Sequence, residues 1–274
     1  MKKYIQAPLP FQGQKRRWIK QLQEVAAKVP EGTVFVDVFG GSGIVSHTLK
    51  QARPDCRVVW NDYVNYSERL QNVAQTNAIL LELRNVTKDC PKKLKIDDPW
   101  RSKVLDVLCR WNKRGYVDWL TISKSVMFSM HFMQSFEGIK GETLYNNVVL
   151  GDYEVDGYLE GVETVRMDWR ELVSLYRGRK DVVLVLDPPY MLTDVSGYKN
   201  DTYWGIEECL DVAMECDDMK FVYFTSDRSG IERVLRWVDR FDGVSSPFTN
   251  AERRVVEVRG KCLNYDDIMY YNVS

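Results

Sequence analysis

Two short runs of aliphatic residues, each ending in a loop rich in Gly or Pro, constrain the fold of this chain most strongly. The first run covers residues 33–39 (TVFVDVF) and precedes GGSG at 40–43, and the second covers 182–186 (VVLVL) and precedes DPPY at 187–190. Short β-branched and aliphatic runs without polar alternation are typical of buried parallel strands. We therefore expect both runs to form central strands of a single sheet.

The segments around these runs predict an α/β architecture. Residues 44–50 have the pattern of a helix and residues 57–62 that of the next strand, which together with the first run make a strand-helix-strand unit. The predicted strands lead into loops that can hold a ligand. Further elements are predicted at 221–226 (strand), 231–238 (helix), and 254–258 with 267–271 (a closing antiparallel pair).

Between residues 85 and 150 the alternation of strands and helices stops, and basic and aromatic residues become frequent. Residues 88–114 contain nine Lys or Arg against four Asp, whereas 151–171 contain seven acidic residues against two Arg. We interpret 85–150 as an inserted helical lobe that divides a catalytic domain into 1–84 and 151–274. Basic residues gathered on one lobe can hold phosphates although the net charge of the chain is −1.

The composition excludes several classes of protein. With 274 residues, 45% of them hydrophobic, the chain can bury one large core and a smaller lobe. No run approaches the roughly 18 apolar residues of a membrane-spanning helix, and the first residues lack the apolar block of a signal peptide. We therefore expect a soluble, cytoplasmic protein with no membrane partner. Six scattered cysteines and two histidines favour reduced thiols and no metal site.

The loop after the first strand carries an acid, Asp37, ahead of its glycines Gly40, Gly41 and Gly43. Such glycines let the backbone approach a ligand closely at a helix N-terminus. An acid in this place would repel a pyrophosphate but could hold the ammonium of S-adenosylmethionine; a plain strand-to-helix turn is the alternative. Asp62, at the end of the next strand, could accept hydrogen bonds from ribose hydroxyls or could be a surface acid ahead of a helix.

The tetrapeptide Asp187, Pro188, Pro189 and Tyr190 is the most specific feature of the sequence. The amino nitrogen of adenine is a poor nucleophile because its lone pair is delocalised into the ring. The Asp187 carboxylate and the Pro188 carbonyl could accept hydrogen bonds from its two N–H groups, and the prolines would hold these acceptors rigidly. Tyr190 could stack on an adenine that has been flipped out of the duplex. A rigid Pro-Pro turn is the structural alternative.

Taken together and in this order, the segments resemble those of the Dam-like D12 class of DNA adenine-N6 methyltransferases over nearly the whole chain. Residues 10–15 (PFQGQK) resemble the opening K-W-x-G-G-K segment of that family, with Phe11 in the place of Trp and Gln14 in the place of Gly. The other matching segments are the cofactor loop at 36–43, the ribose-binding segment at 61–65, the acid-aromatic pair at 166–169, the hairpin at 250–254 and the last strand at 266–272.

The resemblance implies a Rossmann-like, S-adenosylmethionine-dependent methyltransferase fold in which the lobe at 85–150 recognises the target. It implies direct, site-specific methyl transfer to the N6 of a flipped adenine in double-stranded DNA. The implied cofactor-binding residues are Phe11, Lys15, Asp37, Phe39, Gly40, Gly41, Gly43, Asp62, Asp168 and Trp169; from the sequence alone, Asp168 is a helix N-cap. The candidate DNA contacts are Lys92, Lys93, Arg101, Lys103, Arg110, Lys113, Arg114, Arg253 and Arg254, each of which also suits a solvated face.

Other activities agree less well with the motifs. Cytosine-C5 methylation needs a Cys after a Pro, which the chain lacks. Enzymes that methylate cytosine N4 usually have Ser in the place of Asp187. Enzymes that methylate protein glutamine or RNA adenine more typically have Asn there. A DNA-binding regulator or decoy that retains the fold without activity is the alternative from another class, supported by the altered opening segment. We expect a monomer or weak dimer, acting alone or beside a restriction nuclease in a restriction-modification pair.

Overall fold

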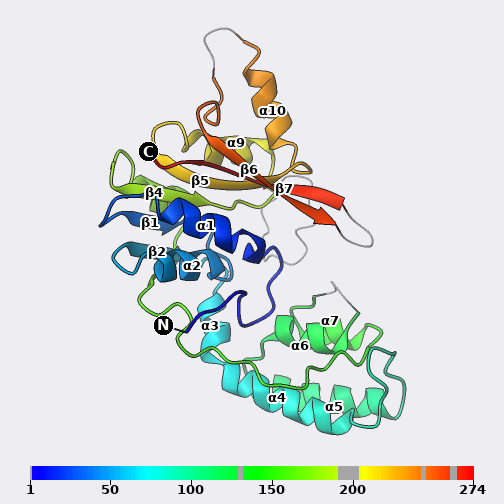
Figure 1. Ribbon diagram of the computed structural model, residues 1–274. Coiled ribbons are helices and arrows are strands. Elements are labelled where there is room, and N and C mark those ends of the chain that lie inside the picture. The colour runs from blue at the N-terminus through cyan, green and yellow to red at the C-terminus, as the bar shows by residue number, and fades with distance from the viewer. Residues whose placement is uncertain (1, 129–131, 191–203, 242–244, 260–263) are drawn as a thin grey trace. The chain divides into compact units, whose positions relative to one another are not determined.

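Seven strands form one sheet in the computed structural model of the protein, in the order β3-β2-β1-β4-β5-β7-β6 (Figure 1). Strands β1 to β5 are parallel, and β7 lies antiparallel between β5 and β6. The structure describes residues 2–128, 132–190, 204–241, 245–259 and 264–274. The strands are β1 Val34–Asp37, β2 Arg57–Asn61, β3 Glu163–Val165, β4 Val182–Leu186, β5 Lys220–Ser226, β6 Glu252–Arg259 and β7 Asn264–Asn272.

The arrangement confirms the predicted α/β class and its two central strands. Strands β1 and β4 are hydrogen-bonded neighbours in the middle of the sheet, and every residue of both is buried. The predicted antiparallel pair is β6 and β7, and the helices predicted at 44–50 and 231–238 are present as α2 and α10. The edge strand β3 has no counterpart among the elements predicted from the sequence.

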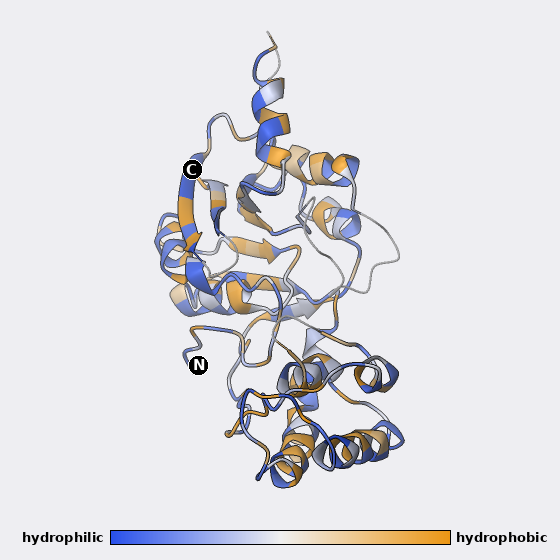
Figure 2. Ribbon diagram, turned by 90° about the vertical axis from the view of Figure 1, so that its right-hand side faces the viewer, coloured by the Kyte–Doolittle hydropathy of each residue, from blue (hydrophilic) through white to orange (hydrophobic). Residues whose placement is uncertain are grey.

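Helices cover both faces of this sheet, which explains why its central strands are apolar without alternation (Figures 1 and 2). Alternate residues of β1, β4 and β5 pack against α8, α9 and α10 on one face. On the other face lie α1 and α2, and the Trp18 ring contacts the Phe224 ring of β5 with centroids 5.8 Å apart. These helices are η1 Arg16–Trp18, α1 Ile19–Ala26, α2 Ile44–Ala52, α8 Trp169–Ser174, α9 Ile206–Met214 and α10 Ile231–Val238.

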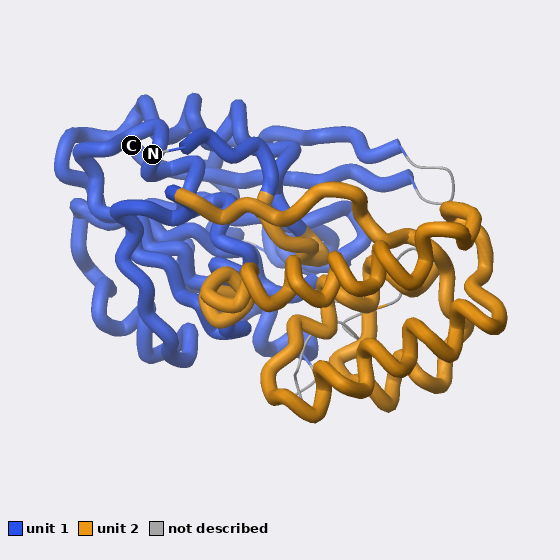
Figure 3. The backbone as a smooth tube through the Cα atoms, turned by 90° about the horizontal axis from the view of Figure 1, so that it is seen from below, with its two compact units in different colours: residues 1–6, 14–65, 157–274 blue, residues 7–13, 66–156 orange. Residues whose placement is uncertain are grey.

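A second compact unit has a hydrophobic core of its own and consists of Ala7–Gly13 and Tyr66–Asp156 (Figure 3). Its bounds differ from the predicted lobe at 85–150, because α3 and α4 also belong to it and the chain contributes an N-terminal segment. Among its described helices, as among those of the first unit, none is long and apolar enough to cross a bilayer. Its helices are α3 Tyr66–Gln71, α4 Val73–Val86, α5 Trp100–Asn112, α6 Trp119–Val126 and α7 Phe136–Lys140.

Two residues of α3 hold the N-terminal segment on this second unit. The Tyr66 hydroxyl donates to the carbonyl of Leu9 and accepts from its N–H, both at 3.0 Å. The Arg69 guanidinium donates to the carbonyl of Pro10 at 2.8 Å and forms a buried ion pair with Asp118 at 3.0 Å. The buried charge is therefore paired, as burial requires, and residues 7–13 are held by named bonds.

Glycine is required at position 40 by packing inside the first unit. A Cβ added to Gly40 would lie 2.0 Å from Cδ1 of Trp60, a fully buried side chain of β2. Because the indole is large and enclosed, it has little freedom to move away. The first glycine of the loop after β1 therefore serves the core as well as the loop.

Gly40→Ala should lower the free energy of unfolding by about 1 to 3 kcal/mol, since the new methyl group overpacks the core at Trp60. Urea denaturation of the purified variant measures this change. Gly151→Ala is the matched control, because a Cβ there meets nothing within 4 Å. The interpretation fails if Gly40→Ala is as stable as the control, and Trp60→Phe should recover part of the loss in the double variant.

Candidate cofactor and catalytic site

The two motif loops leave the sheet side by side. Asp37 ends β1 opposite Val185 of β4, and the N–H of Val38 donates to the carbonyl of Val185 at 2.9 Å. From this pair of strands the chain proceeds in opposite directions, to β2 and β3 on one side and to β5 on the other. Such a switch point at the carboxyl ends of parallel strands is where open α/β sheets bind their ligands.

Asp37 is a buried carboxyl group at the base of the glycine-rich loop. Its side chain is almost inaccessible, and the Ser46 hydroxyl of α2 donates to its Oδ2 at 2.6 Å. Burial raises the pKa of Asp37 to about 7, and the nearby charge of Asp187 adds to this effect, while Ser46 and Lys15 oppose it. The group can therefore change its protonation state near neutral pH and would gain from a cationic partner.

The Lys15 ammonium lies against Asp187, the acid of the DPPY loop. Lys15 Nζ is 2.5 Å from Asp187 Oδ2, and it lies 5.1 Å from the ring centre of Tyr190 and 5.7 Å from that of Phe224. Burial raises the pKa of Asp187, whereas the charge of Lys15 and its hydrogen bond to the carboxylate lower it. The contact with Lys15 thus favours the ionised carboxylate in a site where burial opposes it.

A third carboxyl group belongs to the same cluster. Asp267 of β7 pairs in register with Ser226, the last residue of β5, and so lies at the same edge of the sheet as the DPPY loop. Burial raises the pKa of Asp267; the charge of Asp187 raises it further, and Lys15 lowers it. The sequence analysis did not single out Asp267, because its position depends on the pairing of β7 with β5.

Asn61 ties three segments of the site together, which the sequence analysis also missed. Its amide nitrogen donates to the carbonyls of Val38 and Met167, both at 3.0 Å, and its amide oxygen accepts from the N–H of Met167 at 3.1 Å. Asn61 is buried at the end of β2. A polar amide at the end of an apolar strand is the signal that could have identified it.

Asp62 follows directly after Asn61 and is equally buried. Its N–H donates to the carbonyl of Val165 at the end of β3 at 2.8 Å, and its carbonyl accepts from the N–H of Asn65 in a turn at 3.1 Å. The surface-acid alternative for Asp62 is therefore wrong, because only 1% of the residue is exposed. Its role toward a ribose stays a prediction.

Three aromatic side chains gather beside the glycine-rich loop. Phe39, Trp169 and Trp204 contact one another with ring centroids 5.6 to 6.4 Å apart. Trp169 is buried in the core, and Asp168 caps α8 by accepting from the N–H of Arg170 at 2.8 Å. The helix-cap interpretation of Asp168 is thus confirmed, and Trp204 is an addition that sequence reasoning did not predict.

The remaining predicted cofactor residue, Phe11, belongs to the second unit, where its ring contacts Tyr66 edge to face at 5.7 Å. Within the DPPY loop, Pro188 is buried and Pro189 partly so. The three loop glycines adopt different conformations: only Gly41 and Gly43 have positive φ, at 46° and 76°.

The predicted DNA contacts fall into two groups. Several make bonds inside their own unit: Lys92 to Asn146 and Val148, Arg101 to the carbonyls of Lys140 and Glu142, Arg110 to Glu82, Arg253 to Glu232, and Arg254 to Glu252. Arg114 instead lies over the ring of Trp111 at 4.6 Å. Lys93, Lys103 and Lys113 are exposed, and their side chains form no hydrogen bond or ion pair with the described residues. These four are the better placed for a ligand outside the unit.

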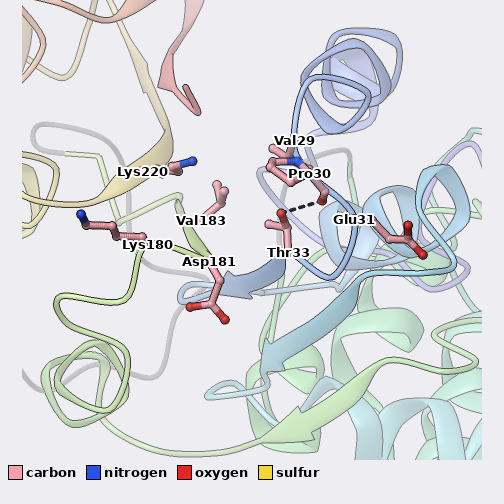
Figure 4. A pocket seen from close by; sticks show the side chains of 8 residues that line it. All are labelled: Val29, Pro30, Glu31, Thr33, Lys180, Asp181, Val183 and Lys220. Carbon is pink, nitrogen blue, oxygen red and sulfur yellow. Dashed lines mark hydrogen bonds between the residues drawn. The ribbon is translucent and has the colours of Figure 1, made fainter.

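A cavity of about 280 Å³ lies at the amino ends of the parallel strands (Figure 4). Thr33, Asp181 and Lys220 line it at the amino ends of β1, β4 and β5, and the Thr33 hydroxyl donates to the carbonyl of Pro30 at 2.8 Å. Since ligands of such sheets bind at the carboxyl ends, this cavity is not the candidate site. Within the described part of the chain, no group of three His, Cys, Asp or Glu residues is arranged to hold a metal ion.

Comparison with known proteins now identifies the family. A protein of Haemophilus influenzae named "Putative methyltransferase" is 32% identical over 98% of this chain and 93% of its own length. The family model of the D12 class of N6 adenine-specific DNA methyltransferases matches residues 11–99. The chain belongs to this D12 class. It is therefore a methyltransferase, and the family model confirms the resemblance over residues 11–99.

Among solved structures, a precorrin-6y C5,15-methyltransferase of Geobacter metallireducens is similar to this D12 methyltransferase over 94% of the chain and 88% of its own length. The sequence identity is 10% and the TM-score is 0.31. The sheet order of the methyltransferase itself defines its fold.

Asp37→Asn should stabilise the protein at neutral pH. Because burial raises the pKa of Asp37 to about 7 from 3.8, the native fold binds a proton more tightly than the unfolded chain, and native stability falls as pH rises from about 4 to about 7. The gain of Asp37→Asn in melting temperature should therefore grow across this range and remain constant above it.

Thermal unfolding at several pH values checks this expectation. The control is Asp181→Asn, because Arg179 lowers the pKa of the Asp181 carboxyl, so that its loss should not stabilise the fold at neutral pH. A gain for Asp37→Asn that does not vary between pH 4 and 8 would contradict the assigned ionisation.

Proposed function

We propose that this chain is a site-specific DNA methyltransferase that transfers a methyl group from S-adenosylmethionine to the N6 of an adenine flipped out of double-stranded DNA. The observation that carries the proposal is the meeting of Asp37 and Asp187 at the switch point of the sheet, with Lys15 paired to Asp187. The family supports a DNA-adenine substrate. In this proposal the Asp37 carboxyl binds a cationic cofactor and the Asp187 carboxyl accepts a bond from an amino group, both at the carboxyl ends of the parallel strands.

The residues around the glycine-rich loop fit S-adenosylmethionine by their chemistry. A buried carboxyl at Asp37 suits its ammonium, and a second at Asp62 suits its ribose hydroxyls. Gly40, Gly41 and Gly43 let the backbone approach the ligand closely where the loop leads into α2. Phe39 and Trp169, whose rings are in contact, would bind the adenine of the cofactor together with Asp168. Phe11 and Lys15 complete the cofactor-binding residues that we propose by resemblance to the family.

The DPPY loop would act on the target base. The Asp187 carboxylate and the Pro188 carbonyl accept hydrogen bonds from the two N–H groups of adenine N6, so that its lone pair is directed at the methyl group, and Tyr190 stacks on the ring. The cofactor supplies an activated methyl group on a sulfonium. After transfer the nitrogen must lose a proton. Burial, which raises the pKa of Asp187, makes this carboxylate a suitable acceptor.

Lys15 has a defined task in this scheme. Burial favours the protonated form of Asp187, whereas the ammonium 2.5 Å from Oδ2 favours the carboxylate, which is the form proposed to accept one of the two N–H bonds. The pair therefore balances two needs: an anion before the transfer and a proton acceptor after it. Lys15 would act through Asp187 as well as toward the cofactor.

The direct test is to incubate the purified protein with radiolabelled S-adenosylmethionine and DNA of mixed sequence, and to identify the labelled base after digestion. The proposal expects label in N6-methyladenine. Cofactor binding without incorporation across diverse DNA would instead support the alternative of an inactive DNA-binding regulator. Methylation-sensitive sequencing of DNA from expressing cells would then define the target sequence and show whether the enzyme works without a restriction nuclease.

Asp187→Ala should reduce methyl transfer at least about 100-fold, because it removes an acceptor needed chiefly in the transition state. DNA affinity should change little, since the variant leaves the second unit intact. Single-turnover methylation and fluorescence anisotropy measure the two quantities. Asp181→Ala, at the exposed amino end of β4, is the control, and turnover of Asp187→Ala close to that of this control would refute the catalytic role.

Lys103→Gln and Lys113→Gln should each weaken DNA binding and reduce the slope of log affinity against log salt by about 1, because each exposed lysine is proposed to neutralise one phosphate. Binding isotherms at several salt concentrations measure the slope. Arg101→Gln removes the same charge from the same helix but also two bonds to carbonyls near α7, so it should lower thermal stability as well. An unchanged slope for both lysine variants would exclude these contacts.

A further inference from the structure

Residues 157–162 pack behind the glycine-rich loop within the first unit. The Tyr158 hydroxyl donates to the carbonyl of Ser42 at 2.8 Å, and both residues are buried. The side chain of Leu159 covers Gly43, where an added Cβ would meet both of its methyl groups at 2.9 Å. This segment lies outside the motifs that identify the family, yet two of its side chains contact the loop directly.

The peptide group between Ser42 and Gly43 is hydrogen-bonded at both of its polar ends, and Tyr158 makes one of these two bonds. The carbonyl of Ser42 accepts from Tyr158, and the N–H of the same peptide, on Gly43, donates to the carbonyl of Gly40 at 2.7 Å. Because a peptide group is planar, its two ends cannot turn independently. Two bonds therefore set the plane of the peptide that leads into α2.

Leu159 is held in a conformation that costs free energy. Its φ is 60°, in the left-handed region that bulky side chains rarely adopt. Strain of this kind persists only where surrounding contacts maintain it, and it is concentrated at functional sites. Two contacts maintain it here. The Leu159 side chain packs over Gly43, and the backbone N–H of Leu159 donates to Nδ1 of His47 at 3.3 Å.

His47 anchors the segment to the helix that the loop begins. It is fully buried on α2, and its ring stacks on Tyr158 with centroids 4.8 Å apart. The backbone N–H of His47 donates to the carbonyl of Gly43 at 2.8 Å. Burial lowers the pKa of His47 to about 4, so the ring is neutral at physiological pH. Segment, loop and helix N-terminus thus form one connected group.

We propose that Tyr158 and Leu159 are positioning residues that set the affinity of the glycine-rich loop for S-adenosylmethionine. The inference rests on the proposed function, because it takes this loop as the cofactor site. By fixing the Ser42 peptide and supporting Gly43, the two side chains hold the loop in its binding conformation before the cofactor arrives. Preorganisation of this kind strengthens binding without entering the chemical step.

Tyr158→Phe removes the hydroxyl while retaining the ring. Isothermal titration should show a dissociation constant for S-adenosylmethionine raised roughly three- to tenfold, the equivalent of one hydrogen bond. At saturating cofactor, kcat should stay within about twofold of the native value, because a positioning residue for the ground state affects KM. Tyr271→Phe is the matched control: Tyr271 lies on β7, which β4 and β5 separate from β1 in the sheet, and its hydroxyl bonds Lys28 and Glu252.

Leu159→Ala tests the second contact, since Ala keeps the same backbone strain and loses only the side chain over Gly43. Hydrogen exchange of the ligand-free protein should show faster exchange at the amides of Gly43 and His47 in both variants, and native rates there in Tyr271→Phe. If the native protein binds the cofactor and Tyr158→Phe binds it equally well, the inference is wrong. If the native protein binds no cofactor, the proposed function fails together with it.

Discussion

The pairing of β1 with β4 in the middle of the sheet is the constraint on which the rest of the site depends. It brings Asp37 and the DPPY loop together at the carboxyl ends of the parallel strands. There the charge of Asp187 raises the pKa of Asp37, and Lys15 lowers the pKa of both carboxyls. Buried carboxylates are costly unless paired. Burial, the largest influence, raises the pKa of Asp37 to about 7, so this carboxyl titrates near neutral pH. The cluster therefore favours a further cation.

The central strands could be predicted because burial on both faces leaves an uninterrupted apolar run, as in Val182–Leu186. The edge strand β3 could not, since its three residues are largely exposed and only the register with β2 makes them a strand. The bounds of the second unit were equally inaccessible. Residues 73–86 were not predicted as an element, and no local pattern shows that Ile79, Leu80 and Leu83 pack into the core of the second unit.

The site was predictable where chemistry and local sequence coincide. Asp37 ends β1 three residues before Gly40, and Asp187 directly follows β4 and precedes Pro188, so their positions followed from the strands. Lys15, by contrast, contacts Asp187 from a segment far away in the sequence, and Asn61 links strand ends through side-chain bonds. Such contacts depend on tertiary pairing, and no local pattern encodes them. The family resemblance placed Lys15 near the cofactor; its pairing with Asp187 came from the structure.

The glycines of the loop show why a motif alone is weak evidence for a ligand. Gly40 is needed because Trp60 fills the space of its side chain, and Gly43 because Leu159 does the same at a positive φ. A protein that bound nothing would keep both for packing. The two carboxyls have no such explanation, because their surroundings raise the pKa of both Asp37 and Asp187 and so disfavour the charged forms. A fold retains an arrangement of this kind when a function requires it, and the acids therefore carry more of the argument than the glycines.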